Sequence, residues 1–102
     1  MTKANIMEVI NLSNNNKSIK WSILENTATK IVLTNDYDKC VNFSISVKND
    51  DGEEYIEAKD NHMGSTVCLL LQGDRRWHDY TETNQGIIIA IEHVVEHFNH
   101  TY

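Results

Sequence analysis

The sequence predicts a single α+β domain, in which an antiparallel meander of four strands, or five, carries a short N-terminal helix and a longer C-terminal helix on one face. Three observations lead to this prediction. Apolar and polar residues alternate through the middle of the chain, which is the pattern of strands with one buried face. Apolar residues recur at helical spacing near both ends. The chain has 102 residues, 40% of them hydrophobic and none of them proline, which suits one core and so one domain over residues 1–102.

The first predicted element is a helix over residues 3–12. Ile6 and Ile10 are four residues apart, which places them on one helical face. Thr2 is a suitable N-cap. Residues 13–16, a serine followed by three asparagines, favour a turn because such side chains compete for backbone hydrogen bonds, so the helix is expected to end there.

Strands of period two follow this helix. The clearest has Val41, Phe43, Ile45 and Val47 on one side and polar residues on the other, as in an antiparallel strand with one wet face. A turn is expected at residues 49–52, where Gly52 can adopt a positive φ. The four strands are predicted over residues 17–23, 29–34, 41–48 and 53–59.

The last third of the chain contains two further elements. Residues 65–73 read as a short helix between Ser65 and Gly73, with a fifth buried strand as the alternative. Asp79 and Glu82 resemble a capping box for the final helix. A glycine inside a helix costs about 1 kcal/mol relative to alanine, so Gly86 makes a later start, near Asn84 or Gln85, equally plausible. The core-facing side chains of this helix, together with Tyr80, are expected to be Ile87, Ile91, Val94, Val95 and Phe98.

Charge supplies the main functional hypothesis. Fifteen acids and nine bases give a net charge of -6, which argues against direct nucleic-acid binding because such proteins concentrate Lys and Arg. Most of the excess lies between Asp36 and Asp60, with Tyr37 and Tyr55 as aromatic neighbours. Acidic hairpins often only keep sheets soluble and guard their edges. The functional interpretation is a non-enzymatic inhibitor, immunity or phage counter-defence protein that docks on a basic surface of a protein target. Its predicted partner-binding residues are Asp50, Asp51, Glu53, Glu54, Tyr55 and Glu57.

A basic and aromatic cluster supports an alternative. Arg75, Arg76 and Trp77 could clamp an anionic nucleotide or metabolite, because a guanidinium binds phosphate and an indole stacks on a base. The cluster lacks a glycine-rich phosphate loop, and paired arginines more often serve the structure. The alternative function is therefore a small-molecule binding module.

The final helix contains a histidine stripe. His93, Glu96 and His97 formally satisfy H-x-x-E-H, but the chain ends five residues later, whereas peptidases with this motif need a further acidic ligand downstream. We expect no metal and no other cofactor. Ile89, His93, His97 and His100 share a helix surface and are a candidate homo-oligomer seam that would loosen near pH 6.

Compartment and redox state complete the expectations. The longest apolar run, residues 87–91, is far shorter than the roughly 20 residues of a membrane span, and no signal peptide is evident. Cys40 and Cys68 show no paired spacing and are expected to be reduced and mostly buried. Abundant Asn, Ile and Lys suggest a low-GC bacterium or its phage. A cytoplasmic protein is expected, in the bacterial cytosol or, if phage-encoded, in the host cytosol.

Overall fold

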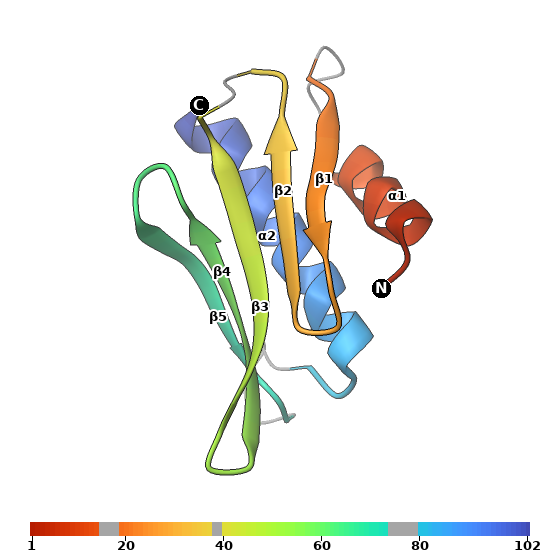
Figure 1. Ribbon diagram of the computed structural model, residues 1–102, viewed down its shortest axis with the longest axis vertical. Coiled ribbons are helices and arrows are strands. Elements are labelled where there is room, and N and C mark those ends of the chain that lie inside the picture. Colours follow the sequence, from red (N-terminus) through yellow and green to blue (C-terminus); the bar gives the residue numbers. More distant parts are fainter. Residues whose placement is uncertain (15–18, 38–39, 74–79) are drawn as a thin grey trace.

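A computed structural model describes residues 1–14, 19–37, 40–73 and 80–102, and shows an α+β fold (Figure 1). Five antiparallel strands form one sheet in the order β1-β2-β3-β4-β5, and both helices pack on one face of it. The elements are α1 (Lys3–Ser13), β1 (Trp21–Asn26), β2 (Lys30–Asn35), β3 (Asn42–Asp50), β4 (Glu53–Asp60), β5 (Ser65–Leu71) and α2 (Thr83–Thr101). This arrangement confirms the predicted fold class.

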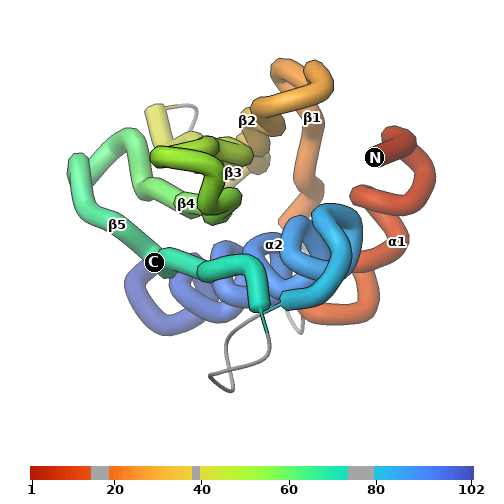
Figure 2. The backbone as a smooth tube through the Cα atoms, turned by 90° about the horizontal axis from the view of Figure 1, so that it is seen from below, coloured from red at the N-terminus to blue at the C-terminus, as the bar shows by residue number. Residues whose placement is uncertain are grey.

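The sheet curves around α2. Seen along the strands, α2 lies in the concave side of the sheet, and α1 lies beside it, next to β1 (Figure 2). The predicted N-terminal helix is confirmed, with the Thr2 hydroxyl accepting a hydrogen bond from the Asn5 N–H at 3.3 Å as an N-cap. Each helix presents one apolar face inward, since Ile6 and Ile10 of α1 are fully buried.

The core lies between the sheet and α2. The alternation of the predicted strands is confirmed, because their apolar side chains face α2 while the polar ones face outward. The predicted core face of α2 is also confirmed, and Tyr80 is buried with it. The largest fully buried side chains are Tyr80, Phe43, Phe98, Ile6, Ile10, Leu33, Ile45, Ile56, Leu70, Ile91, Val41 and Val94.

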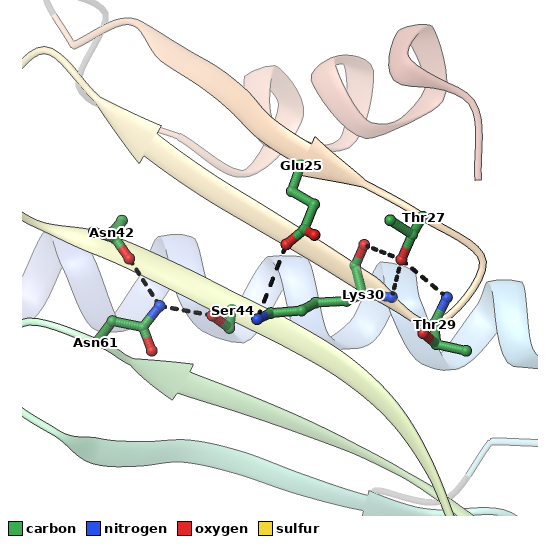
Figure 3. Close-up of polar contacts among 7 residues, drawn as sticks. All are labelled: Glu25, Thr27, Thr29, Lys30, Asn42, Ser44 and Asn61. Carbon is green, nitrogen blue, oxygen red and sulfur yellow. Dashed lines mark hydrogen bonds and ion pairs between the residues drawn. The ribbon is translucent and has the colours of Figure 1, made fainter.

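The opposite face of the sheet is polar along β3 and much of β4. The Asn61 amide donates to Asn42 Oδ1 at 2.8 Å and to Ser44 Oγ at 2.6 Å, which ties the β4–β5 turn to β3 (Figure 3). Lys30 and Glu25 form a loose ion pair across β1 and β2 at 3.9 Å. Exposed pairs of this kind contribute little to stability. This part of the outer face is therefore exposed to solvent and does not pack against a second layer of the core.

β3 and β4 form a two-residue hairpin. Asp51 and Gly52 have φ values of 52° and 83°, so both central residues of the turn are left-handed, as the favoured tight hairpin turns require. The Gly52 N–H donates to Asn49 Oδ1 at 3.1 Å and fastens the turn. The predicted positive φ at Gly52 is confirmed.

The prediction of a helix at residues 65–73 is wrong. The segment is β5, and it pairs with β4 from Asp60↔Ser65 to Tyr55↔Leu71. A single helix of this length is marginal in water, whereas the free edge of β4 offers a full ladder of backbone partners. Cys68 and Leu70 also gain a place against the core in the strand conformation, so tertiary pairing decides the structure.

The start of α2 also differs from the predicted capping box. Helix α2 begins at Thr83, so Glu82 is its N-cap residue and makes no side-chain capping bond, while Asp79 lies outside the described residues. Gly86 falls inside the helix for a packing reason. A Cβ at this position would lie 2.5 Å from Ile56 Cδ1 and 2.7 Å from Tyr80 Cγ. The glycine lets the buried Tyr80 ring lie directly on the first turn of α2.

Candidate functional site

The β3–β4 hairpin projects beyond the rest of the sheet at one end of the molecule (Figure 1). Its tip carries Asp50, Asp51 and Glu53, all exposed, and we call these three residues the acidic tip. Asp50 and Glu53 are directly opposite one another across the hairpin. Like charges in this position repel, and the pair destabilises the hairpin by a few tenths of a kcal/mol up to about 1 kcal/mol.

The hairpin lysine does not neutralise the tip. Lys48 donates to Glu57 Oε1 at 2.9 Å, and this hydrogen bond and the charge of Glu57 raise the pKa of the lysine. The pair satisfies Glu57, which sequence reasoning assigned to the partner surface, and it lies further along the strands than the tip. Glu57 is therefore a weaker element of that surface than the three tip acids.

Glu54 faces inward rather than toward a partner. Its Oε1 accepts hydrogen bonds from the Tyr80 hydroxyl at 3.1 Å and from the Thr83 hydroxyl at 2.7 Å. Burial and the neighbouring Glu54 charge raise the pKa of Tyr80, so its hydroxyl remains a donor at neutral pH. Glu54 thus fastens the base of the hairpin to the start of α2, an internal role that the sequence pattern did not indicate.

The most buried carboxylate of the predicted acidic stretch is Asp60, whose side chain is 0% exposed. Its Oδ1 accepts hydrogen bonds from the His62 N–H at 2.9 Å and the Met63 N–H at 3.1 Å, in the turn between β4 and β5. Its Oδ2 accepts one from the Tyr102 hydroxyl at 2.9 Å and lies 3.1 Å from His97 Nε2. This cluster, which we call the Asp60 network, joins the β4–β5 turn to the C-terminal part of α2.

The hydrogen bonds decide the ionisation of Asp60. Burial by itself would raise its pKa, but the bonds from Met63, His97, Tyr102 and His62 outweigh burial and lower it below the usual value. The carboxylate is therefore charged at neutral pH, and each of its two oxygens has two hydrogen-bond partners. In the part of the chain that the structure describes, no serine, threonine or cysteine side chain is hydrogen-bonded to His97. These contacts are those of a structural clamp.

Sequence reasoning missed this network and misplaced Tyr37. The i, i+4 spacing of His93 and His97 drew attention to the helix surface, but the partner of His97 is Asp60 at the end of β4, 37 residues earlier. Tyr37 was expected to be an aromatic neighbour of one acidic surface formed by the stretch from Asp36 to Asp60. It lies instead at the other end of the sheet, with its ring 5.6 Å from Phe98 and 6.5 Å from Tyr102.

The predicted oligomer seam is not a continuous exposed surface. Ile89 is partly buried and packs against the core, and His97 is held by Asp60. Helix α2 has β5 on one flank and α1 on the other, so a residue away from the main core face can still contact protein (Figure 2). His100 remains exposed, and within the described ranges no three His, Cys, Asp or Glu side chains are grouped as metal ligands.

The end of the molecule that carries Tyr37 has a groove of about 1150 Å³, which lies between α1, α2 and Tyr37. Leu12 is the most exposed large hydrophobic side chain in it, and Glu92 and Glu96 give it an acidic side. Its lining residues are Val9, Leu12, Ser13, Ile19, Tyr37, Ile88, Glu92, Glu96, Phe98, Asn99, His100 and Tyr102.

The two cysteines differ from one another, and neither forms a disulfide. Burial raises the pKa of Cys68, on β5, to about 11, so this thiol stays protonated at neutral pH and is a poor nucleophile. Cys40 is exposed, against expectation, because it lies in the turn before β3 rather than in the strand.

The remaining sequence predictions fall outside the described residues or concern the whole chain. Arg75, Arg76 and Trp77, the alternative ligand site, lie in the segment 74–79, which the structure does not describe. In the described ranges, no helix has the length and apolar character needed to cross a membrane. No protein-family model, no curated protein and no solved structure matches this chain, so its function has to be argued from its own geometry.

Proposed function

We propose that this chain is a non-enzymatic binding protein whose acidic tip docks on a basic surface of a target protein, as an inhibitor, immunity or counter-defence factor does. The observation that carries the proposal is the acidic tip itself, with Asp50, Asp51 and Glu53 exposed at the end of a projecting hairpin. The proposal includes a cytoplasmic location, bacterial or, for a phage protein, in the host cell.

The arrangement of the tip supports binding over mere solubility. Carboxylates that only solubilise a sheet have no reason to face one another, because opposite charges or a neutral pair would stabilise the hairpin instead. Asp50 and Glu53 nevertheless form such a like-charge pair, with Asp51 in the turn between them. A focused negative potential of this kind steers association with a basic partner and speeds it at low salt.

The internal contacts sharpen which residues take part. Glu54 holds the hairpin base and Glu57 is paired with Lys48, so the docking surface contracts to the acidic tip with Tyr55 beside it. Tyr55 is half-buried on the outer face of β4, directly opposite Lys48. A rigid aromatic side chain at the border of a charged surface suits a contact residue.

A charge-reversal comparison tests the proposal. The variant Asp50→Lys/Glu53→Lys leaves both turn residues intact. Glu8→Lys/Glu96→Lys is its matched control, because these acids are exposed and lie on the helices, outside the hairpin. Each tagged protein is used at low and high salt to capture soluble proteins from a bacterial lysate, and the association rate is then measured on the captured target.

The two variants should separate clearly. We expect wild type and control to retain the same basic protein at low salt, and the tip variant to lose it together with the salt dependence of its association rate. Equal retention by the tip variant, or equal loss in the control, contradicts docking through the tip.

A further inference from the structure

The outer edge of β5 has backbone groups that point away from the sheet. The Gln72 N–H donates to the Glu54 carbonyl at 3.1 Å, and in an antiparallel ladder every second residue makes such bonds. The register pairs Leu70 with Ile56 and Cys68 with Ala58, so Leu70 and Cys68 are also bonded to β4. Leu69 and Leu71, which alternate with them, therefore direct their N–H and C=O groups outward.

Part of this edge already accepts another segment. The Leu71 carbonyl accepts the Tyr80 N–H at 3.3 Å, and the Gly73 N–H donates to the Tyr80 carbonyl at 2.8 Å, in a short parallel bridge. Within the described ranges, the N–H and C=O of Leu69 and the N–H of Leu71 have no protein partner. Unpaired groups in a row at a sheet edge are a template for a further strand.

The side chains of this edge are apolar and uncharged. Cys68 and Leu70 face the core, so Leu69 and Leu71 lie on the outer face of the sheet, and the Leu69 side chain is 53% exposed. Residues 61–73 form the longest stretch of the sequence without Asp, Glu, Lys or Arg. Edge strands that stay solitary are guarded by lysine, proline, inward-pointing charge, bulges or covering segments, and the guards of β5 are a bulge at Val67 and the Tyr80 bridge, which leave Leu69 between them open.

We propose that β5 pairs antiparallel with β5 of a second copy of this chain, about a two-fold axis at Leu69. The N–H and C=O of Leu69 in each copy then bond those of Leu69 in the other, and the two side chains lie side by side on the outer face. The residue of β4 that pairs with Leu69 is Glu57, and the charge of Glu57 is balanced by its ion pair with Lys48. This inference is independent of the target of the acidic tip.

The charge of the chain favours this seam and this direction. Two copies that each carry a net charge of -6 repel over most of their surfaces, and an uncharged edge is where they approach at least cost. Antiparallel pairing also directs the two projecting hairpins to opposite ends of the joined sheet, so the acidic tips stay apart (Figure 1).

Two features limit the length of the seam. Ala58 pairs with Cys68 and Lys59 with Thr66, so Val67 is the extra residue of a bulge and ends the regular edge on one side. Tyr80 occupies the other side. A seam of a few residues between these limits implies a weak, concentration-dependent dimer rather than an obligate one.

Sedimentation velocity of the full chain, from low micromolar to high micromolar concentration, tests this inference. The wild type should move from the 11.8 kDa monomer toward twice that mass. Leu69→Lys places two like charges against one another in the seam. Leu69→Pro removes an outward N–H that makes no bond to β4, although its ring also fixes φ and restricts Cys68. Leu24→Lys is the control, since Leu24 is an exposed leucine on the other edge strand, β1, where it is the extra residue of a bulge.

We expect both Leu69 variants to weaken the dimer at least about tenfold while Leu24→Lys leaves it unchanged. Circular dichroism checks that each variant is folded, and Leu69→Lys decides the question if the proline variant is not. A wild type that stays monomeric at every concentration overturns the inference. So does a dimer that persists in folded Leu69→Lys, or one that Leu24→Lys abolishes equally.

Discussion

The two ends of the 39 Å long axis hold carboxylates in opposite ways. At the hairpin end, Asp50, Asp51 and Glu53 are exposed, and two of them face each other across the ladder. At the other end, Asp60 is fully buried and receives hydrogen bonds on both oxygens. The comparison teaches that the acidic stretch from Asp36 to Asp60 is not one functional unit. Its buried members hold the fold together, and its exposed members are available to a partner.

The largest expected effect on stability comes from removing the buried Asp60 carboxylate. Asp60→Ala removes the acceptor for the His62 and Met63 N–H groups, the Tyr102 hydroxyl and His97, and so takes away the part-buried hydrogen bonds of the Asp60 network. We expect the free energy of unfolding to fall by about 3 kcal/mol or more in urea denaturation. Asp60→Asn, which keeps one acceptor oxygen, should lose less. A loss below about 1 kcal/mol for Asp60→Ala would mean that the network does not hold this end together.

The second prediction tests whether the contacts at the base of the hairpin contribute to stability as the Asp60 network does. Gly86→Ala forces a Cβ against Ile56 and the Tyr80 ring, and Tyr80 positions the donor for Glu54. We expect a loss of about 1 to 3 kcal/mol in urea denaturation, even though alanine is the better helix former by about 1 kcal/mol. Ile56→Val removes the nearest clashing atom, so the double variant should lose less than the sum of the two single changes. A stabilised Gly86→Ala protein would contradict the packing that we describe.

The pH dependence of stability separates the two kinds of carboxylate. The folded pKa of Asp60 is lowered relative to its unfolded value of about 3.9, so the folded state favours the charged form. Its contribution to stability is complete above the unfolded pKa and is lost as the pH falls from about 4 through the folded pKa. The stability gap between wild type and Asp60→Asn, measured by urea denaturation at stepped pH, should therefore narrow below about pH 4. A gap that stays constant down to pH 2 would contradict a charged Asp60.

The smallest effect has the opposite sign. Asp50→Lys converts the like-charge pair with Glu53 into an opposite-charge pair at the hairpin tip. We expect a gain of about 0.5 kcal/mol in the free energy of unfolding, measured with Asp50→Asn as the neutral reference. Binding to the basic target should weaken in the same variant, since the tip loses part of its field. A destabilised Asp50→Lys protein would show that the tip acids serve the fold after all.

Much of the fold follows from local patterns in the sequence. Apolar residues alternate with polar ones around Phe43 and recur at helical spacing around Ile91, because each element is buried on one side. This periodicity can be identified in a single sequence. β5 was misassigned because its run of apolar residues lacks a clear period, and its conformation depends on the free edge of β4, which local sequence does not encode.

The candidate site was predicted only in part for a related reason. The acidic tip is contiguous in the chain and could be identified from composition. The side-chain partners of Glu54 and Asp60, by contrast, lie 26 to 42 residues away, at Tyr80, Thr83, His97 and Tyr102. An acid with a distant internal partner looks the same in the sequence as a solvated one.

The way the hairpin is fastened has a consequence for how such a protein can evolve. Glu54 locks the hairpin base to α2, whereas the tip contributes no side chain to the core and its turn tolerates any pair of residues that accepts positive φ. Substitutions at the tip therefore alter the surface offered to a partner almost without altering stability. A lineage could follow a changing target by varying residues 50, 51 and 53 alone, while selection keeps Gly52 for the turn and Glu54, Tyr80 and Gly86 together as one unit.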